Sequence, residues 1–248
     1  PEWFRRGVEA ALLAPTAMNQ QNFNLICSDG GVTASAGRGF YTKLDLGIVK
    51  YHFEAGAGKE SFEKFRLDVY PDRLDPKLGI SPRALMKRVY ESAVSYARTF
   101  STASESLLFM GATGLGKTLL SGCIARAVAD RGYSVCYVSA GKLFSDFETE
   151  KFRLKEDGAL TGEYLQTDLL IIDDLGTELV NTFTTSQLFY VVNERLNRKK
   201  GTIISTNLPV NEMRDEFTDR VMSRIISQYQ IIPLYGEDIR IRKKLENR

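Results

Sequence analysis

Apolar runs and stretches of helical periodicity alternate along most of the chain after residue 80. Ser81 and Pro82 form a helix-opening pair, and apolar residues then recur at helical spacing to about residue 99. Five strands follow, four of them continuous apolar runs typical of strands covered on both faces; they are predicted at residues 107–110, 134–138, 169–172, 202–205 and 230–234. Helices are predicted between them, near residues 117–130, 140–149, 184–198 and 217–227. This alternation predicts an α/β fold, a parallel sheet sandwiched by helices.

The first 58 residues follow a different pattern, which is rich in small residues. A helix is predicted over residues 2–13, ended by Pro15, and a short strand over residues 23–27 with a turn after it. A second helix is predicted near residues 44–54. A segment this short buries too little apolar surface to be stable by itself. We therefore expect a small α+β segment ahead of the larger α/β domain.

Composition is that of an ordinary globular protein. The 248 residues are 43% hydrophobic and 26% charged. The formal net charge is only +2, which excludes a strongly basic protein that coats nucleic acid over its whole surface. No apolar run approaches the ~20 residues of a bilayer-spanning helix, and no signal-peptide core follows the start, so we expect a cytoplasmic protein without a membrane partner. Cys27, Cys123 and Cys136 form no CxxC pair and are expected to be reduced thiols.

A phosphate-binding motif lies directly after one predicted strand and directly before a helix. Residues 111–118 match G-x-x-x-x-G-K-[ST] in full, although a glycine-rich turn is the simpler alternative. The glycines let backbone N–H groups approach phosphate oxygens, and the helix adds the positive end of its dipole. Lys117 is expected at the β- and γ-phosphates and the Thr118 hydroxyl at Mg²⁺. The nucleotide-binding residues predicted are Gly111, Ala112, Thr113, Gly114, Leu115, Gly116, Lys117, Thr118 and Leu119.

Polar residues follow two later predicted strands, those at residues 169–172 and 202–205. Asp173 and Asp174 follow the run at residues 169–172. Because open α/β sheets bind ligands at the carboxyl ends of their strands, Asp173 is expected to reach Mg²⁺ and Asp174 to polarise the attacking water. Glu178 is the alternative for the water, since the Asp174 side chain is short. Asn207 ends a later strand, where its amide can bridge the γ-phosphate and the water; a solvated strand end or a turn is the alternative at these positions.

The order of these motifs resembles the AAA+ ATPases, and more narrowly the DnaC/DnaI-type helicase loaders and their IstB-like transposition relatives. The resemblance covers residues 61–248 and rests on the stretches at residues 107–118, 171–176, 204–209, 219–225 and 236–240. It implies a P-loop NTPase (AAA+) fold, with a linker and entry helix over residues 61–100 and the ATPase domain over residues 101–248.

The same resemblance implies further roles. Asn207 matches the sensor-1 position, and Arg240 matches the sensor-2 position. Arg224 matches the arginine finger, which reaches the ATP of a neighbouring subunit, and Arg220 is the alternative for that role. A finger acting in trans implies a homo-oligomeric ring or spiral. We therefore expect a Mg²⁺-dependent ATPase that binds ATP and ADP and loads a replicative DNA helicase on single-stranded DNA. A transposition helper ATPase, and a module that holds ATP without turnover, are the alternatives.

The first segment resembles another family. Residues 2–4, 9–21 and 45–54 are similar to the C-terminal part of nitroreductase-like flavoproteins. That resemblance covers residues 1–58, within a segment expected over residues 1–60, and implies, as a different class of function, a flavin-dependent oxidoreductase. Asn19 and Gln20 are the flavin contacts it would use, with a helix-to-strand turn as the alternative at these positions. About 60 residues are too few for a complete flavin site.

Overall fold

The computed structural model describes residues 23–28, 31–36, 61–76, 78–153, 159–178 and 180–239. The chain divides into two units, residues 1–64 and residues 65–248. In the smaller unit, β1 (Phe23–Ser28) and β2 (Gly31–Ala36) form an antiparallel hairpin, and a short 3₁₀ helix, η2, spans Phe62–Lys64. The strand predicted at residues 23–27 is confirmed, whereas β2 was not predicted. The helices predicted over residues 2–13 and near residues 44–54 lie outside the described residues.

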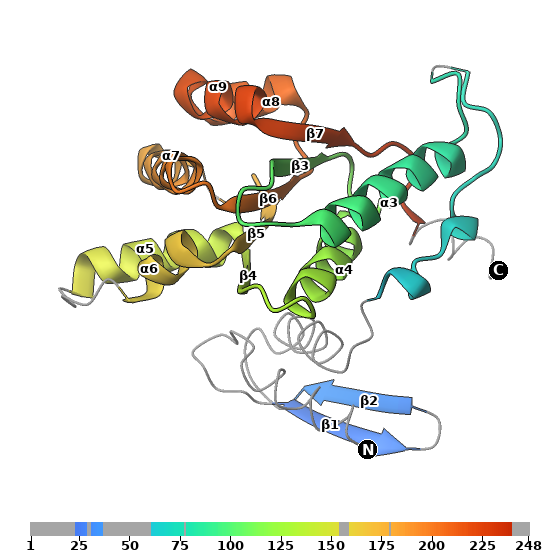
Figure 1. The fold of residues 1–248 in the computed structure, drawn as a ribbon, viewed down its shortest axis with the longest axis horizontal. Helices are drawn as coiled ribbons and strands as arrows, with labels where there is room; N and C mark the ends of the chain where they lie inside the picture. The colour runs from blue at the N-terminus through green and yellow to red at the C-terminus, as the bar shows by residue number, and fades with distance from the viewer. Residues whose placement is uncertain are drawn as a thin grey trace. The chain divides into compact units, whose positions relative to one another are not determined.

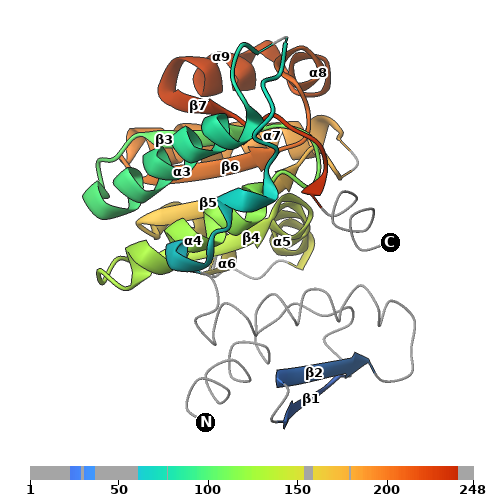
Figure 2. The same ribbon diagram turned by 90° about the vertical axis from the view of Figure 1, so that its right-hand side faces the viewer.

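The larger unit is built on a five-stranded parallel sheet. Its strand order is β4-β5-β6-β3-β7, which Figure 2 shows from bottom to top. Every neighbouring pair in it runs parallel, as predicted. The strands, all predicted to within three residues at each end, are β3 (Ser106–Met110), β4 (Val135–Ser139), β5 (Leu169–Leu175), β6 (Gly201–Thr206) and β7 (Tyr229–Pro233).

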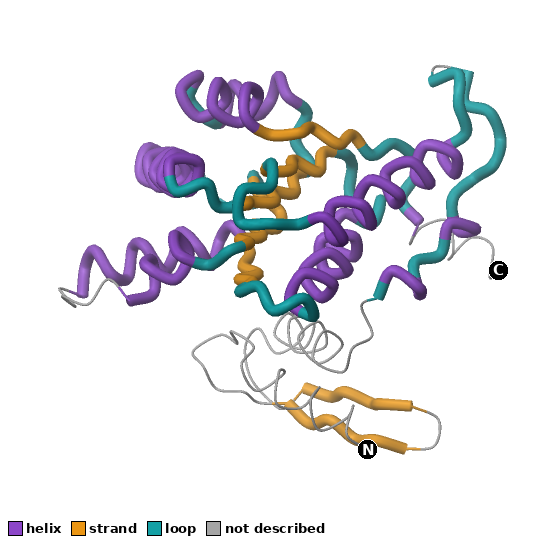
Figure 3. Tube along the Cα trace, in the orientation of Figure 1, coloured by secondary structure: helices purple, strands orange, loops and turns teal. Residues whose placement is uncertain are grey.

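Helices cover both faces of this sheet. Figure 1 looks along the sheet, so that α3 and α4 lie on one side and α5 to α9 on the other, and Figure 3 shows the same layers coloured by type of structure. A 3₁₀ helix, η3 (Leu67–Val69), precedes them. The α-helices are α3 (Pro82–Thr99), α4 (Lys117–Ala129), α5 (Ala140–Arg153), α6 (Ala159–Gln166), α7 (Thr182–Asn197), α8 (Val210–Glu216) and α9 (Asp219–Gln228). All five predicted helices of this unit are confirmed; α6 and α8 were not predicted.

The core explains the continuous apolar runs. Leu108, Ile172 and Ile204, from β3, β5 and β6, join a buried cluster with Leu188 and Val191 of α7. Because side chains alternate along a strand, the neighbouring buried residues of the same strands face the layer of α3 and α4. The three central strands are therefore apolar on both faces. No helix among the described residues is long and apolar enough to cross a membrane.

The start of α3 agrees with its predicted cap. The Ser81 side chain accepts a hydrogen bond from the Ala84 N–H at 3.2 Å, and Pro82 occupies the first turn. A proline is tolerated there because its missing N–H would have no partner within the helix. The helix thus begins where the sequence places its N-cap.

A buried arginine joins α7 to the amino-terminal edge of the sheet. The Arg195 guanidinium is fully buried and donates to the carbonyl oxygens of Tyr164 at 2.7 Å and Thr167 at 3.0 Å. It also donates to the Gly201 carbonyl at 2.5 Å and the Thr202 hydroxyl at 2.9 Å. Burial lowers the pKa of Arg195 to about 10, which still leaves the group charged at neutral pH. Its donors pair with buried carbonyl groups at the end of α6 and the start of β6, where polar groups need a hydrogen-bond partner.

Replacing Arg195 with methionine, which keeps an apolar chain but removes the donors, tests this arrangement. We expect the free energy of unfolding to fall by about 3 kcal/mol or more, because several buried carbonyl groups lose their partners. Denaturant unfolding followed by circular dichroism measures the change. Arg198→Met is the matched control: this residue of the next turn pairs with Glu194 at the surface, and its loss should cost less than about 0.5 kcal/mol. Equal, small losses for both variants would contradict the assignment.

Candidate functional site

The loop at residues 111–116 carries the chain from β3 into α4 at the carboxyl end of the sheet. Gly114 and Gly116 have φ values of +78° and +94°, in the left-handed region that favours glycine. A Cβ atom on Gly114 would overlap the carboxylate of Asp238, and one on Gly116 would lie 2.8 Å from the Tyr70 hydroxyl. The loop therefore needs glycine at these positions both for its backbone conformation and for space.

Segments distant in sequence hold this loop from two directions. The Tyr70 hydroxyl, from the stretch before α3, donates to the Leu115 carbonyl at 2.9 Å. Burial raises the pKa of Tyr70 well above its usual value, which keeps the phenol protonated as a donor. From the segment after β7, the Ile239 N–H donates to the Gly114 carbonyl at 3.3 Å. The loop conformation is thus supported by tertiary contacts as well as by its glycines.

Lys117 is buried at the start of α4 and joins this loop to the end of β6. Only 4% of the residue is exposed. Its Nζ donates to the carbonyl oxygens of Gly111 at 2.6 Å and Ala112 at 2.9 Å, and to Oδ1 of Asn207 at 2.6 Å. An ammonium group has three donors, and these bonds direct them to oxygens of the loop and of Asn207. The structure therefore brings together two predicted site residues that are 90 positions apart.

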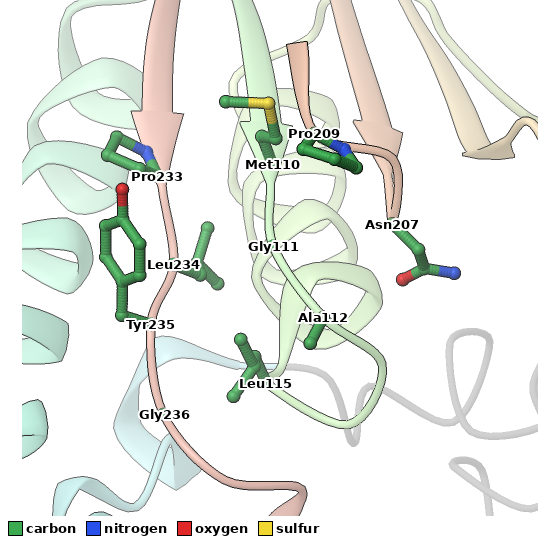
Figure 4. A pocket seen from close by; sticks show the side chains of 10 residues that line it. All are labelled: Met110, Gly111, Ala112, Leu115, Asn207, Pro209, Pro233, Leu234, Tyr235 and Gly236. Atoms are coloured by element: carbon green, nitrogen blue, oxygen red, sulfur yellow. The ribbon is translucent and has the colours of Figure 1, made fainter. Parts of the chain in front are cut away.

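A cavity of about 220 Å³ is lined by Asn207 and by the two loop residues, Gly111 and Ala112, whose carbonyl groups accept from Lys117. It lies between the start of the loop, the turn after β6 and the segment after β7. In Figure 4 the Asn207 amide and the Tyr235 ring lie on opposite sides of it, and Leu115 lies between them. Most of its lining is apolar, so it suits a planar or apolar group next to a phosphate site. The lining residues are Met110, Gly111, Ala112, Leu115, Asn207, Pro209, Pro233, Leu234, Tyr235 and Gly236.

The carboxyl end of β5 is irregular at its two acidic residues. The pairing of β5 with β6 shifts register between Ile172 and Leu175, so that Asp173 and Asp174 lie in a bulge. Asp173 is buried, with 7% exposed, and accepts a hydrogen bond from the Tyr137 hydroxyl at 2.9 Å and another from the Ser205 hydroxyl. Bulges re-aim side chains next to active sites. No pattern in the sequence indicates these two hydroxyl partners.

Asp174 and Glu178, the two candidates for polarising the water, differ in exposure and in their hydrogen bonds. Asp174 has a φ of +56°, is exposed, and donates its N–H to the Ser205 hydroxyl oxygen at 3.0 Å. The Glu178 carboxylate accepts from the Gly176 N–H at 3.1 and 3.2 Å, one distance to each oxygen. Burial raises the pKa of Glu178. Asp174 is therefore exposed at the end of β5, while the Glu178 carboxylate accepts hydrogen bonds in the turn that follows.

The remaining predicted site residues differ in how exposed they are. Thr118 is half-buried in the first turn of α4, whereas Leu119 is exposed, as are Ala112 and Thr113 at the loop. Arg224 is exposed on α9. In the same helix, the guanidinium of Arg220 lies 5.3 Å from the centre of the Phe189 ring. Arg240 lies outside the described residues.

A metal ion would need more than protein ligands here. In the part of the chain that the structure describes, no group of three or more His, Cys, Asp or Glu side chains could hold a metal. The Asp173 carboxylate and the Thr118 hydroxyl are hard oxygen ligands. Mg²⁺ is commonly bound by one or two carboxylates together with substrate phosphates and water, rather than by an all-protein cage. The residues present therefore fit Mg²⁺ brought in with a nucleotide.

Two family models match the chain. Residues 85–247 match the model described as "IstB-like ATP binding protein", and residues 1–57 match the one described as "Putative TM nitroreductase". The first match covers well over half of the chain. Both agree with the resemblances drawn from the sequence.

Individual relatives and solved structures agree with the match to the IstB-like model. The "Insertion sequence IS232 putative ATP-binding protein" of Bacillus thuringiensis subsp. berliner is 24% identical over 148 residues, which span 58% of this chain and 58% of that protein. The crystal structure of the DnaC helicase loader has a TM-score of 0.58 at 19% identity, covering 70% of this chain and 98% of that one. Replication initiator DnaA bound to AMPPCP and single-stranded DNA has a TM-score of 0.58 at 20% identity, covering 76% of this chain and 55% of that one. The larger unit thus has the P-loop AAA+ fold.

Proposed function

The chain belongs to the family of IstB-like ATP-binding proteins, and from that premise we propose that it binds and hydrolyses ATP in order to load a replicative helicase on single-stranded DNA. The observation that carries the proposal is the buried Lys117 ammonium, which the loop at residues 111–116 and Asn207 hold at the carboxyl edge of the sheet. A buried cation beside a glycine-rich loop and a helix N-terminus favours a phosphate group.

Nucleotide binding is proposed for residues 111–119. The N–H groups of the loop and of the first turn of α4 donate to phosphate oxygens, and Lys117 pairs with the β- and γ-phosphates. Lys117 also donates a hydrogen bond to the Asn207 side chain. A phosphate that attracts the Lys117 ammonium therefore takes this donor away from the Asn207 amide. Binding at the loop is thereby communicated to the end of β6. The apolar cavity beside the loop accommodates the base or the ribose, and the DnaA structure with AMPPCP supports a nucleotide in this fold.

Thr118 and Asp173 are the proposed magnesium ligands. When bound there, Mg²⁺ would supply positive charge that neutralises the charge developing on the phosphate. Thr118 contributes its hydroxyl from the first turn of α4. Asp173 contributes a carboxylate whose orientation its two hydroxyl partners fix.

Asp174 is the proposed group that polarises the attacking water. Its side chain is exposed at the carboxyl end of β5, while Glu178 is engaged with the Gly176 N–H. Asn207 is proposed to orient the same water and the γ-phosphate. An exposed carboxylate at the carboxyl end of a strand can meet a bound ligand, whereas the Glu178 carboxylate lies in the turn and accepts hydrogen bonds from the Gly176 N–H.

Two arginines are proposed to act on the phosphates from different subunits. Arg224 is exposed on α9, which allows it to reach the nucleotide of a neighbouring copy in a ring or spiral. Arg240 is proposed as the sensor-2 residue of its own subunit. An arginine beside the transferring phosphoryl group stabilises the negative charge of the transition state. We further propose residues 61–100 as linker and entry helix and residues 101–248 as the ATPase domain.

The proposed partner is a replicative helicase. The DnaC helicase loader supports this choice, since the similarity covers 98% of its chain. The relative from insertion sequence IS232 supports a transposition helper instead, and this chain spans little more than half of that protein. The ATPase chemistry is common to both roles, so the partner alone separates them.

Phosphate release from ATP tests the proposed hydrolysis. Asp174→Asn should lower kcat by about 100-fold or more, because the general base is lost, while the affinity for ATP stays near the wild-type value. Glu178→Gln should retain most of the activity. Asp215→Asn, an exposed aspartate of α8, is the matched control and should leave kcat unchanged.

Two outcomes would overturn this assignment. Loss of activity in Glu178→Gln with normal turnover in Asp174→Asn would transfer the role to Glu178. A wild-type protein that binds ATP but releases no phosphate would make the chain a nucleotide-binding switch instead of an enzyme.

Co-purification with a tagged replicative helicase tests the partner. We expect retention of the wild-type chain in the presence of ATP and Mg²⁺, and loss of that nucleotide-dependent retention in Lys117→Ala. A transposase of the insertion-sequence type is the competing bait. Retention on the transposase and not on the helicase would favour the transposition role.

A further inference from the structure

Two hydroxyl groups, one from each strand beside β5, hold the carboxylate of Asp173. The Tyr137 hydroxyl donates to Oδ2 at 2.9 Å, and the Ser205 hydroxyl donates to Oδ1. Tyr137 belongs to β4 and Ser205 to β6, the two neighbours of β5 in the sheet. Each carboxylate oxygen therefore has its own donor, and the donors approach from opposite sides.

The burial of Asp173 makes these two bonds important. With 7% of the residue exposed, the carboxylate depends on protein donors in place of water. Hydrogen bonds to an ionised group are shorter and stronger than those between neutral groups. Rotation of the carboxylate would break both bonds together, so the pair fixes its plane. An ionised carboxylate has about four lone-pair sites, and the two that remain are available to a metal ion.

Ser205 also fixes the neighbouring residue of the bulge. Its hydroxyl oxygen accepts the Asp174 N–H at 3.0 Å while its hydrogen is donated to Asp173. One side chain thus holds the Asp173 carboxylate and the Asp174 backbone, which has a left-handed φ of +56°. Ser205 is fully buried in β6, so its position is set by the sheet.

We propose that Tyr137 is a positioning residue for the metal-binding carboxylate, and that it acts together with Ser205 to hold Asp173 in one orientation for Mg²⁺. This inference rests on the proposed function, since it concerns the magnesium site of the nucleotide complex. Tyr137 acts through Asp173 and not on the nucleotide. Its loss should therefore weaken the contribution of the metal and leave the affinity of the metal-free nucleotide intact.

A Tyr137→Phe variant removes the hydroxyl and keeps the ring. The binding of a fluorescent, non-hydrolysable ATP analogue is titrated in excess Mg²⁺ and again in EDTA. The ratio of the two Kd values measures how much the metal strengthens binding, without any need for turnover. We expect the metal-dependent strengthening to fall about tenfold in Tyr137→Phe, the scale typical of partners that orient a metal ligand, with the Kd in EDTA within about twofold of wild type.

Two further variants complete the experiment. Ser205→Ala should lower the same ratio at least as much, because it also releases the Asp174 backbone. Tyr190→Phe removes a hydroxyl from an exposed tyrosine of α7 and should match wild type. The Kd in EDTA also reports on folding, since a misfolded variant would lose nucleotide binding in both conditions.

The outcomes separate this inference from the proposed function. If wild type binds the analogue no better with Mg²⁺ than in EDTA, the proposed metal site fails and the inference fails with it. If wild type shows the metal effect and Tyr137→Phe retains it in full, only the role of Tyr137 is overturned. The same conclusion follows if Tyr137→Phe weakens binding equally in both conditions, because the hydroxyl would then support the fold and not the metal ligand.

Discussion

The buried ammonium of Lys117 is the constraint on which the candidate site depends. It lies at the junction of β3 and α4, and it is hydrogen-bonded to two carbonyl oxygens of the loop and to Asn207 at the end of β6. A buried cation is stable only where oxygens surround it, so the loop must keep its carbonyl groups turned toward the lysine. The glycines with positive φ make that turn possible, and contacts from Tyr70 and Ile239 preserve it.

The parallel sheet brings the other groups to the same edge. Asp173 ends the regular part of β5 and Asn207 follows β6, and the two strands are adjacent. Hydroxyl groups of β4 and β6 take the place of water around the buried carboxylate. The bulge in β5 gives two consecutive acidic residues different environments, one buried and one exposed. A regular strand would also place Asp173 and Asp174 on opposite faces of the sheet. It would, however, keep Asp174 in the regular hydrogen-bond pairing between β5 and β6.

Most of the fold of the larger unit could be predicted from the sequence, because long apolar runs and amphipathic helices carry strong periodic signals. The missed elements lack such signals: α6 has eight residues, α8 has seven and no side-chain cap, and β2, in the smaller unit, consists mostly of small residues. That residues 111–116 form a glycine-dependent loop between a strand and a helix was predictable from the spacing of the glycines and the lysine. The bond between Lys117 and Asn207 and the bond between Tyr137 and Asp173 were not predictable, because strand order and register are needed to show that these residues meet.

Calorimetric titration of ATP into the wild-type chain and into Lys117→Ala tests the central claim most directly. The account predicts saturable binding to wild type and at least a tenfold weaker Kd for the variant, since one charge-assisted contact to phosphate contributes about 1.5–3 kcal/mol. An absence of binding heat with wild type, or equal affinities for the two proteins, would contradict the assignment of a nucleotide site to this loop.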